Sequence, residues 1–139
     1  MTLRNSSQYD TKEVRALVRF ATSEVDMRGV HVNVKNAKST PYRGMAYEGV
    51  PMISDARGKA DYLVTIGIGS EDRFPIPSAQ RSTRWPKYEM NDWREALVLV
   101  AAHEAKHIEQ FKEDKPRSEV ACEHFAARML RRYREEVAA

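Results

Sequence analysis

LVLVAAHEAKHIEQF, the stretch from Leu97 to Phe111, joins an apolar run to two histidines, His103 and His107, that stand four residues apart. The apolar run predicts a helix whose first half is anchored in the core. In a helix, side chains at positions i and i+4 project from one face about one turn apart. The two imidazoles can therefore bind one metal ion between them.

Glu104 adds a possible general base to the histidine pair. A catalytic zinc site takes three protein ligands and leaves a position for water, whose pKa falls towards about 7. Glu104 is rotated by about 100° from His103, so it can reach that water rather than the ion. The alternative is that the two histidines are hydrogen-bonded residues of the core. This interpretation is based on the spacing of Ala96, Val100, His103 and His107, which puts all four on the same buried face of the helix.

A third ligand is expected from the helix that follows. The residues KEDKPR interrupt the helical pattern, which resumes at Arg117 or Ser118 and continues to about Glu136. If the intervening turn centres near Asp114, the antiparallel arrangement places two glutamates opposite the histidines. We expect Glu119 to be the third ligand and Glu123 to orient a ligating histidine, and the reverse assignment stays open.

The rest of the sequence predicts an N-terminal helix, a small sheet and a long loop. Asp10 with Glu13 forms a capping box for a helix over residues 11–24. Alternating or β-branched runs predict three short strands, at Val30–Val34, Gly44–Ile53 and Asp61–Gly69. Residues 70–91 contain three prolines and no sustained period, which is typical of a long loop. Together these elements predict a single α+β domain over residues 1–139.

The composition restricts the class of protein. The 139 residues are 42% hydrophobic and 31% charged, and no apolar run approaches the roughly 18 residues that span a bilayer. The chain begins without the apolar segment of a secretory signal, and the single cysteine, Cys122, excludes an internal disulfide framework. We therefore expect a soluble, cytoplasmic protein that does not enter membranes.

Nucleic acid is not an expected partner. The net charge is only +3, and the basic residues do not form an arm or a concentrated stripe. The cluster RRYRE, from Arg131 to Glu135, lies where a helix is predicted to end, and cations suit that position. The segment RSTRW, from Arg81 to Trp85, is the feature that would favour a small nucleic-acid-binding protein instead.

Two motifs give the sequence a family resemblance. HEAKH matches the zincin motif in full, and EVACEHFAARML resembles the glutamate helix of the ImmA/IrrE family. That helix carries a glutamate, a small residue three positions later, a polar residue four positions later and then Phe-Ala, here Glu119, Cys122, Glu123, Phe125 and Ala126. The chain thus resembles the zincin metallopeptidases, and among them a minimal gluzincin, whose third ligand is a glutamate.

The resemblance implies a zinc-dependent metallopeptidase with a minimal zincin-like fold. Zinc would lie on His103, His107 and Glu119, with Glu104 as the base that activates the attacking water. The edge strand of the sheet would lie over the cleft and pair with an extended peptide or protein substrate. The alternative is a non-catalytic regulatory or partner-binding protein that retains the fold.

The donor that stabilises the oxyanion stays open among several residues. The sequence offers Tyr88, on the long loop just before the histidine helix, and His124, on the glutamate helix. Tyr133 and Arg117 are further candidates. The sequence does not rank these four side chains.

Overall fold

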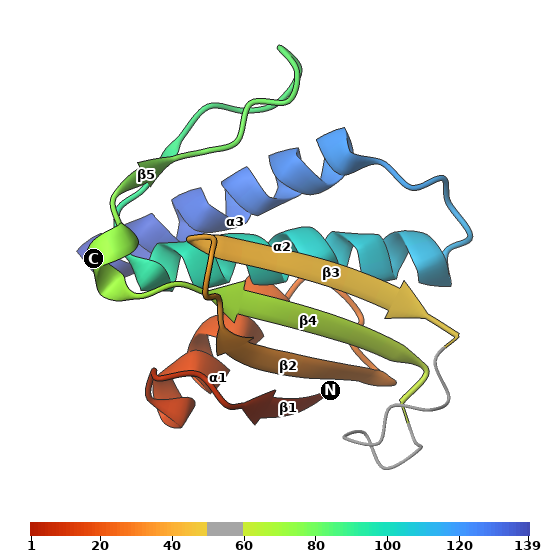
Figure 1. The fold of residues 1–139 in the computed structure, drawn as a ribbon. Helices are drawn as coiled ribbons and strands as arrows, with labels where there is room; N and C mark the ends of the chain where they lie inside the picture. Colours follow the sequence, from red (N-terminus) through yellow and green to blue (C-terminus); the bar gives the residue numbers. More distant parts are fainter. Residues whose placement is uncertain (50–59) are drawn as a thin grey trace.

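The fold is a mixed sheet packed against helices, described here from a computed structural model for residues 1–49 and 60–139. The sheet has four strands in the order β1-β2-β4-β3 (Figure 1). Strands β1, β2 and β4 are parallel, and β3 runs antiparallel at one edge. Their bounds are Thr2–Asn5 for β1, Val30–Asn36 for β2, Tyr42–Glu48 for β3 and Tyr62–Ile68 for β4. The predicted α+β class is confirmed.

Two strands differ from the sequence prediction. Strand β1 was not predicted, because its four residues, TLRN, are too short and too polar to show a strand pattern. It forms because it pairs in parallel with β2, from Thr2 beside His31 to Asn5 beside Val34. The predicted strand over residues 44–53 overlaps β3 from Gly44 to Glu48, and its part from residue 50 onward lies outside the described residues.

Three helices begin at the capping residues that their sequences supply. They are α1 (Thr11–Ala21), α2 (Trp93–Lys112) and α3 (Glu119–Ala138). The side chains of Asp10, Asp92 and Ser118 each accept a hydrogen bond from a backbone N–H in the first turn. Helix α1 ends at Ala21, three residues before the predicted residue 24, because the chain tightens after Thr22: the N–H groups of Ser23 and Val25 bond to carbonyls three residues back instead of four.

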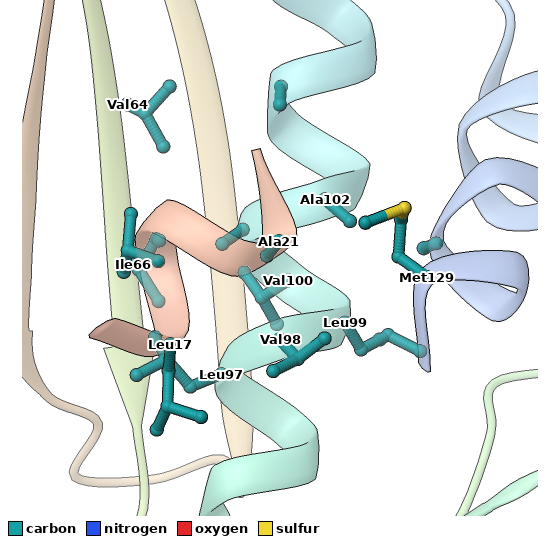
Figure 2. Close-up of a cluster of buried hydrophobic side chains, with 14 of the residues drawn as sticks. Leu17, Ala21, Val64, Ile66, Leu97, Val98, Leu99, Val100, Ala102 and Met129 are labelled. Carbon is teal, nitrogen blue, oxygen red and sulfur yellow. The ribbon is translucent and has the colours of Figure 1, made fainter. Parts of the chain in front are cut away.

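Helix α2 is the centre of the fold because it packs against the sheet, α1 and α3 at once. All residues from Leu97 to Ala102 are buried, as expected for a helix covered on every side. Leu97 lies toward Ile66 of the sheet, whereas Leu99 and Ala102 lie toward Met129 of α3 (Figure 2). The helix that carries the histidines is therefore held on both sides by rigid elements.

The segment between the sheet and α2 is more ordered than the predicted loop. It contains a short 3₁₀ helix at Glu71–Arg73 and two short paired strands, β5 (Ile76–Pro77) and β6 (Glu89–Met90). The Ser78 N–H also donates to the Tyr88 carbonyl at 2.8 Å, so residues 76–90 form a hairpin-like excursion, named the 76–90 arm below. This arm extends away from the sheet on the side of α3 (Figure 1). No helix in the described part of the chain is long and apolar enough to cross a membrane.

Candidate metal centre

The hairpin of α2 and α3 brings the predicted site residues together. Asp114, in the turn, has a φ of 53°, a left-handed conformation that reverses the chain sharply. The Lys115 N–H closes the turn on the Gln110 carbonyl at 2.9 Å. As a result, Glu119 and Glu123 in the first turns of α3 face the middle of α2.

The carboxylate of Glu119 contacts both histidines. Its Oε2 lies 2.9 Å from Nε2 of His103, and its Oε1 lies 3.1 Å from Nε2 of His107. The ring centroids of the two histidines are 5.1 Å apart, consistent with the predicted i, i+4 placement on one face. Three donor groups that suit a metal ion thus converge on one point.

The other ring nitrogen of each histidine has a partner of its own. Nδ1 of His107 lies 3.0 Å from Oε1 of Gln110, which can only accept a hydrogen bond. Nδ1 of His103 lies 2.8 Å from Oε1 of Glu123, whose Oε2 accepts a hydrogen bond from the Tyr88 hydroxyl at 2.9 Å. These contacts fix both rings with Nδ1 protonated and Nε2 directed at Glu119.

This arrangement fits a bound cation. Burial lowers the pKa of His107, which favours its neutral form. With the proton on Nδ1, the lone pair of Nε2 then faces the Glu119 carboxylate, and two acceptors meet without a hydrogen between them. A metal ion accepts donation from both groups, so these residues could hold a divalent cation.

Glu104 lies beside this donor set but is not part of its contacts. It is 5% exposed, and among the described residues no hydrogen bond or ion pair reaches its carboxylate. Burial raises its pKa to about 7. The charges of Glu119 and Glu123 also raise this pKa, whereas those of His103 and Arg117 lower it. A carboxyl group with such a pKa can both accept and release a proton near neutral pH.

Gly44 of the edge strand allows Glu104 to occupy this position. A Cβ at Gly44 would lie 2.5 Å from Cγ1 of Val100 and 2.7 Å from Oε2 of Glu104. The backbone of β3 and the metal-site face of α2 can therefore approach each other only where the strand has no side chain.

The carboxylates also raise the pKa of His103. Burial alone would lower it, but the contact with Glu123 and the charges of Glu104 and Glu119 prevail. Conversely, the pKa of Glu119 is lowered, because the two histidines and Arg117 offset the effect of its burial. The centre thus holds three carboxyl groups around two imidazoles, and a divalent cation would offset two negative charges there.

Cys122 is a further potential ligand. Its sulfur and a nitrogen of each histidine all lie within 4.8 Å of one another, so His103, His107 and Cys122 could hold a metal ion. Burial, however, strongly raises the pKa of the Cys122 thiol, which opposes the thiolate form that binds metals. Its sulfur also lies 3.9 Å from Oε1 of Gln110. That oxygen contacts Nδ1 of His107, whereas Nε2 of His107 contacts Glu119.

The donor set forms part of the wall of a cleft with a volume of about 730 Å³. Strand β3 lines one side through residues 42–45, the 76–90 arm lines another, and α2 and α3 contribute the charged residues. This size is within the range of ligand-binding pockets in proteins. The metal-site histidines and Glu104 are therefore accessible from a cavity bordered by the edge of the sheet.

The four candidate oxyanion donors lie in different places. Arg117 lines the cleft, and its Nε lies 3.5 Å from Oε1 of Glu119. The Tyr88 hydroxyl is engaged by Glu123, and Nε2 of His124 lies 2.8 Å from the Arg84 carbonyl oxygen. Tyr133 packs edge-on against Phe20, with ring centroids 6.0 Å apart. The structure thus brings only Arg117 of the four into the lining of the cleft.

Gln110 and Gly44 were not recognised as site residues from the sequence. Gln110 follows His107 by three residues, a spacing at which side chains on a helix meet. This spacing could have identified Gln110 as a partner of His107 from the sequence. Gly44 stands inside a predicted strand, where glycine often marks a close approach of another element.

Comparison with known proteins gives no relative for this chain. No protein-family model, curated protein or solved structure matches it.

Proposed function

We propose that this protein is a zinc-dependent metallopeptidase. The observation that carries the proposal is the position of Glu104, a buried carboxylate without a partner among the described residues, beside the His103–His107–Glu119 donor set. A purely structural metal site has no need of a base next to its ligands. An accessible cleft in front of that base supplies the room for a substrate.

His103 and His107, through Nε2, and Glu119, through its carboxylate, are the proposed ligands. Their donor types are those of catalytic zinc sites with two histidines and one glutamate. Glu123 and Gln110 hold the two rings through Nδ1, which fixes the direction of each lone pair. When bound there, zinc supplies a Lewis acid for the substrate carbonyl and lowers the pKa of a coordinated water.

The edge of β3 is the proposed docking site for the substrate backbone. Strand β3 is last in the strand order, so one row of its backbone N–H and C=O groups has no strand partner among the described residues. An extended peptide can add to such an edge as a further strand. Since residues 42–45 of β3 line the cleft, a peptide bound in this way would pass the metal centre.

Glu104 would move the proton during hydrolysis. Its carboxylate would accept a proton from the attacking water, and the resulting acid would protonate the amine of the leaving peptide. The packing of α2 against β3 buries this carboxylate beside the cleft.

Glu104→Gln tests the proposal because it removes the base and keeps the side-chain shape. The zinc-loaded protein would be assayed with a quenched-fluorescent library of random peptides, and zinc content would be measured by elemental analysis. We expect unchanged zinc content and a loss of hydrolysis of about 10²–10⁴-fold. Glu109→Gln, on the same helix beside Lys106, is the matched control and should cleave like the wild type.

Two outcomes would contradict the proposal. Hydrolysis by Glu104→Gln at the wild-type rate would exclude Glu104 as the base. Zinc bound by both proteins without hydrolysis by either would favour the non-catalytic alternative, a partner-binding protein.

A further inference from the structure

The charged residues that line the cleft divide into two groups. The carboxylates of Glu104, Glu119 and Glu123 all surround the two histidines. Every other charged side chain in the described lining is an arginine, namely Arg43, Arg81 and Arg117. One divalent cation would offset two of the three carboxylate charges, so arginine charges would exceed the remaining carboxylate charge in the metal-loaded cleft.

Arg81 is the arginine that is most available to a ligand. It lies in the 76–90 arm, is exposed, and its guanidinium carbon lies 5.9 Å from the centre of the Trp85 ring. No carboxylate among the described residues forms an ion pair with it. A cation–π contact with an aromatic ring helps to orient a guanidinium and leaves its N–H groups free to bind an anion.

Arg81 and Tyr42 line the same cleft as the metal centre. The pKa of Tyr42 is raised mainly by burial and then by Glu123, while a backbone hydrogen bond with Ala79 and the charge of Arg81 lower it. The charges of Glu123 and Arg81 therefore both act on the Tyr42 phenol, in opposite directions. Arg81, Tyr42 and Glu123 all line the same cleft, so Arg81 borders the cavity that contains the metal centre rather than a remote surface.

Arg117 supplies positive charge beside the centre itself. Its Nε lies 3.5 Å from Oε1 of Glu119, and its side chain is about half exposed. If Glu119 coordinates an ion, that ion largely neutralises the Glu119 carboxylate. The guanidinium of Arg117 is then available to bind a ligand in the cleft. Arg43 contributes less, because its aliphatic part and Nε lie over Gly67 on the opposite face of the sheet.

From this arrangement we infer that the cleft selects peptides that carry a carboxylate close to the cleaved bond, bound by Arg81 with support from Arg117. The inference rests on the proposed peptidase function and names its substrate class. An arginine can bind a carboxylate through two parallel N–H···O bonds, so the geometry suits acidic ligands better than neutral or basic ones. Basic peptides would meet two guanidinium groups and be disfavoured.

The carboxylate could come from an acidic side chain or from the C-terminus of the peptide. Both present the same group to Arg81, but they imply different cleavage. An acidic side chain would make the protein an endopeptidase with a sequence preference, whereas a C-terminal carboxylate would restrict cleavage to chain ends. Peptides with free and amidated C-termini distinguish these two sources.

Binding to zinc-loaded Glu104→Gln tests the inference without dependence on turnover. The probes are dye-labelled twelve-residue peptides of alternating alanine and glutamate, with glutamine and lysine counterparts, each with a free or an amidated C-terminus. Fluorescence anisotropy at low and at physiological salt gives the affinities. We expect the glutamate peptide to bind roughly tenfold more tightly than the glutamine peptide, with the difference falling as salt rises.

Charge reversal at Arg81 should remove this preference. In the Glu104→Gln background, Arg81→Glu should bind the glutamate and glutamine peptides equally or reverse their order. Arg131→Glu changes the net charge equally at an exposed position of α3 outside the cleft and should keep the preference. Circular dichroism would verify that both variants are folded.

The possible results separate the inference from the proposed function. Equal binding of the glutamate and glutamine peptides with no difference between free and amidated C-termini, including no measurable binding of any probe, would overturn the inference, as would an equal loss of preference in Arg131→Glu. Selective binding of the glutamate peptide without cleavage by the wild-type protein would uphold acidic recognition and contradict the peptidase function. A preference that depends only on the free C-terminus would assign the carboxylate to the chain end.

Discussion

The hydroxyl of Tyr88 lies 2.9 Å from Oε2 of Glu123, and the two residues are 35 positions apart in the sequence. The other oxygen of Glu123 lies 2.8 Å from Nδ1 of His103. A chain of contacts therefore runs from the 76–90 arm, through one carboxylate, to a proposed zinc ligand. The arm that borders the cleft also helps to orient the metal centre.

Replacing Tyr88 with Phe tests this connection. The change removes one hydroxyl and keeps the ring, so Glu123 loses a hydrogen bond and is free to rotate away from His103. Removing a group that orients a metal ligand commonly weakens metal affinity, here by about tenfold at most because Tyr88 acts through Glu123. Competition with a zinc-binding dye would measure the affinity.

Tyr47→Phe is the matched control for this variant. Tyr47 lies on β3, is 43% exposed and does not line the cleft, so its hydroxyl should not affect zinc binding. Equal zinc affinity of Tyr88→Phe and the wild-type protein would show that the hydroxyl does not act on the centre.

The three residues that compete for the role of third ligand can be separated by substitution. Because Glu119 contacts Nε2 of both histidines, Glu119→Gln should lose bound zinc at stoichiometric metal concentration. Glu123→Gln should retain zinc with an affinity about 10–100-fold lower, since it only orients His103. Cys122→Ala should retain zinc, because its thiol is buried and its pKa is raised.

Elemental analysis of the purified variants measures these differences. The Glu109→Gln variant, with an unchanged donor set, should contain as much zinc as the wild-type protein. Zinc that survives in Glu119→Gln but is lost from Glu123→Gln would reverse the two roles. Loss of zinc only in Cys122→Ala would assign the site to the thiol and the two histidines.

Removal of the metal should lower the stability of the fold. A ligand that binds only the native state stabilises it by about 2.7 kcal/mol when it is present at 100 times its Kd. For a chain of this size, that energy corresponds to a decrease in Tm of roughly 5–10 °C after chelation. Differential scanning calorimetry with and without a chelator would measure it, and the Tm of Glu119→Gln should not respond.

The sequence predicted the elements whose signals are local. The capping pair at Asp10 and Glu13 identified the start of α1, and the Asp10 side chain accepts the predicted N–H. The i, i+4 spacing placed His103 and His107 on one face, and the length of the turn placed Glu119 opposite them. These features follow from helix geometry, which depends on neighbours in the sequence.

What the sequence did not predict depends on contacts between distant segments. Strand β1 is specified by its pairing with β2, and its four residues carry no pattern of their own. The contact of Tyr88 with Glu123 required the path of the 76–90 arm, which its prolines and turn residues do not define. For the same reason His124, adjacent to Glu123 in the sequence, lies against the Arg84 carbonyl instead of lining the cleft.

Gly44→Ala should damage the site through packing. The added methyl group would lie 2.5 Å from Val100 and 2.7 Å from the Glu104 carboxylate, so the strand, the helix or the base must move. Overpacking of this kind costs about 1–3 kcal/mol in the free energy of unfolding. Peptide hydrolysis should fall by more than this destabilisation explains, since the base itself is displaced.

Gly67→Ala is the control for a methyl group added to the same sheet. Its Cβ would mainly meet the flexible Arg43 side chain at 3.0 Å, away from Glu104, so it should reduce activity far less. Urea denaturation and peptide hydrolysis of both variants would be compared. Full activity of Gly44→Ala would show that the close approach of β3 and α2 is not required.

The pairing of Glu95 with Arg134 should make stability depend on pH independently of the metal. Glu95 is 7% exposed, and Arg134 donates to its two oxygens at 2.7 and 3.0 Å, with a further bond from the Asn91 N–H at 2.9 Å. Burial tends to raise the pKa of Glu95, but these hydrogen bonds prevail and lower it. The native state therefore binds a proton at this site less readily than the unfolded chain does.

The sign of the effect follows from that lowered pKa. Glu95 contributes its full stabilisation above the pKa of an unfolded glutamate, about 4.3, and this contribution is lost as the pH falls further toward the native pKa. Glu95→Gln should thus cost roughly 1–3 kcal/mol at pH 7, where Arg134 would lose its charged partner, and progressively less below pH 4. Urea unfolding from pH 7 to pH 3 would measure the difference, with Glu135→Gln, at an exposed position of α3, as the control. A difference between Glu95→Gln and the wild type that stays constant over this range would show that the pair does not determine the acid stability of the fold.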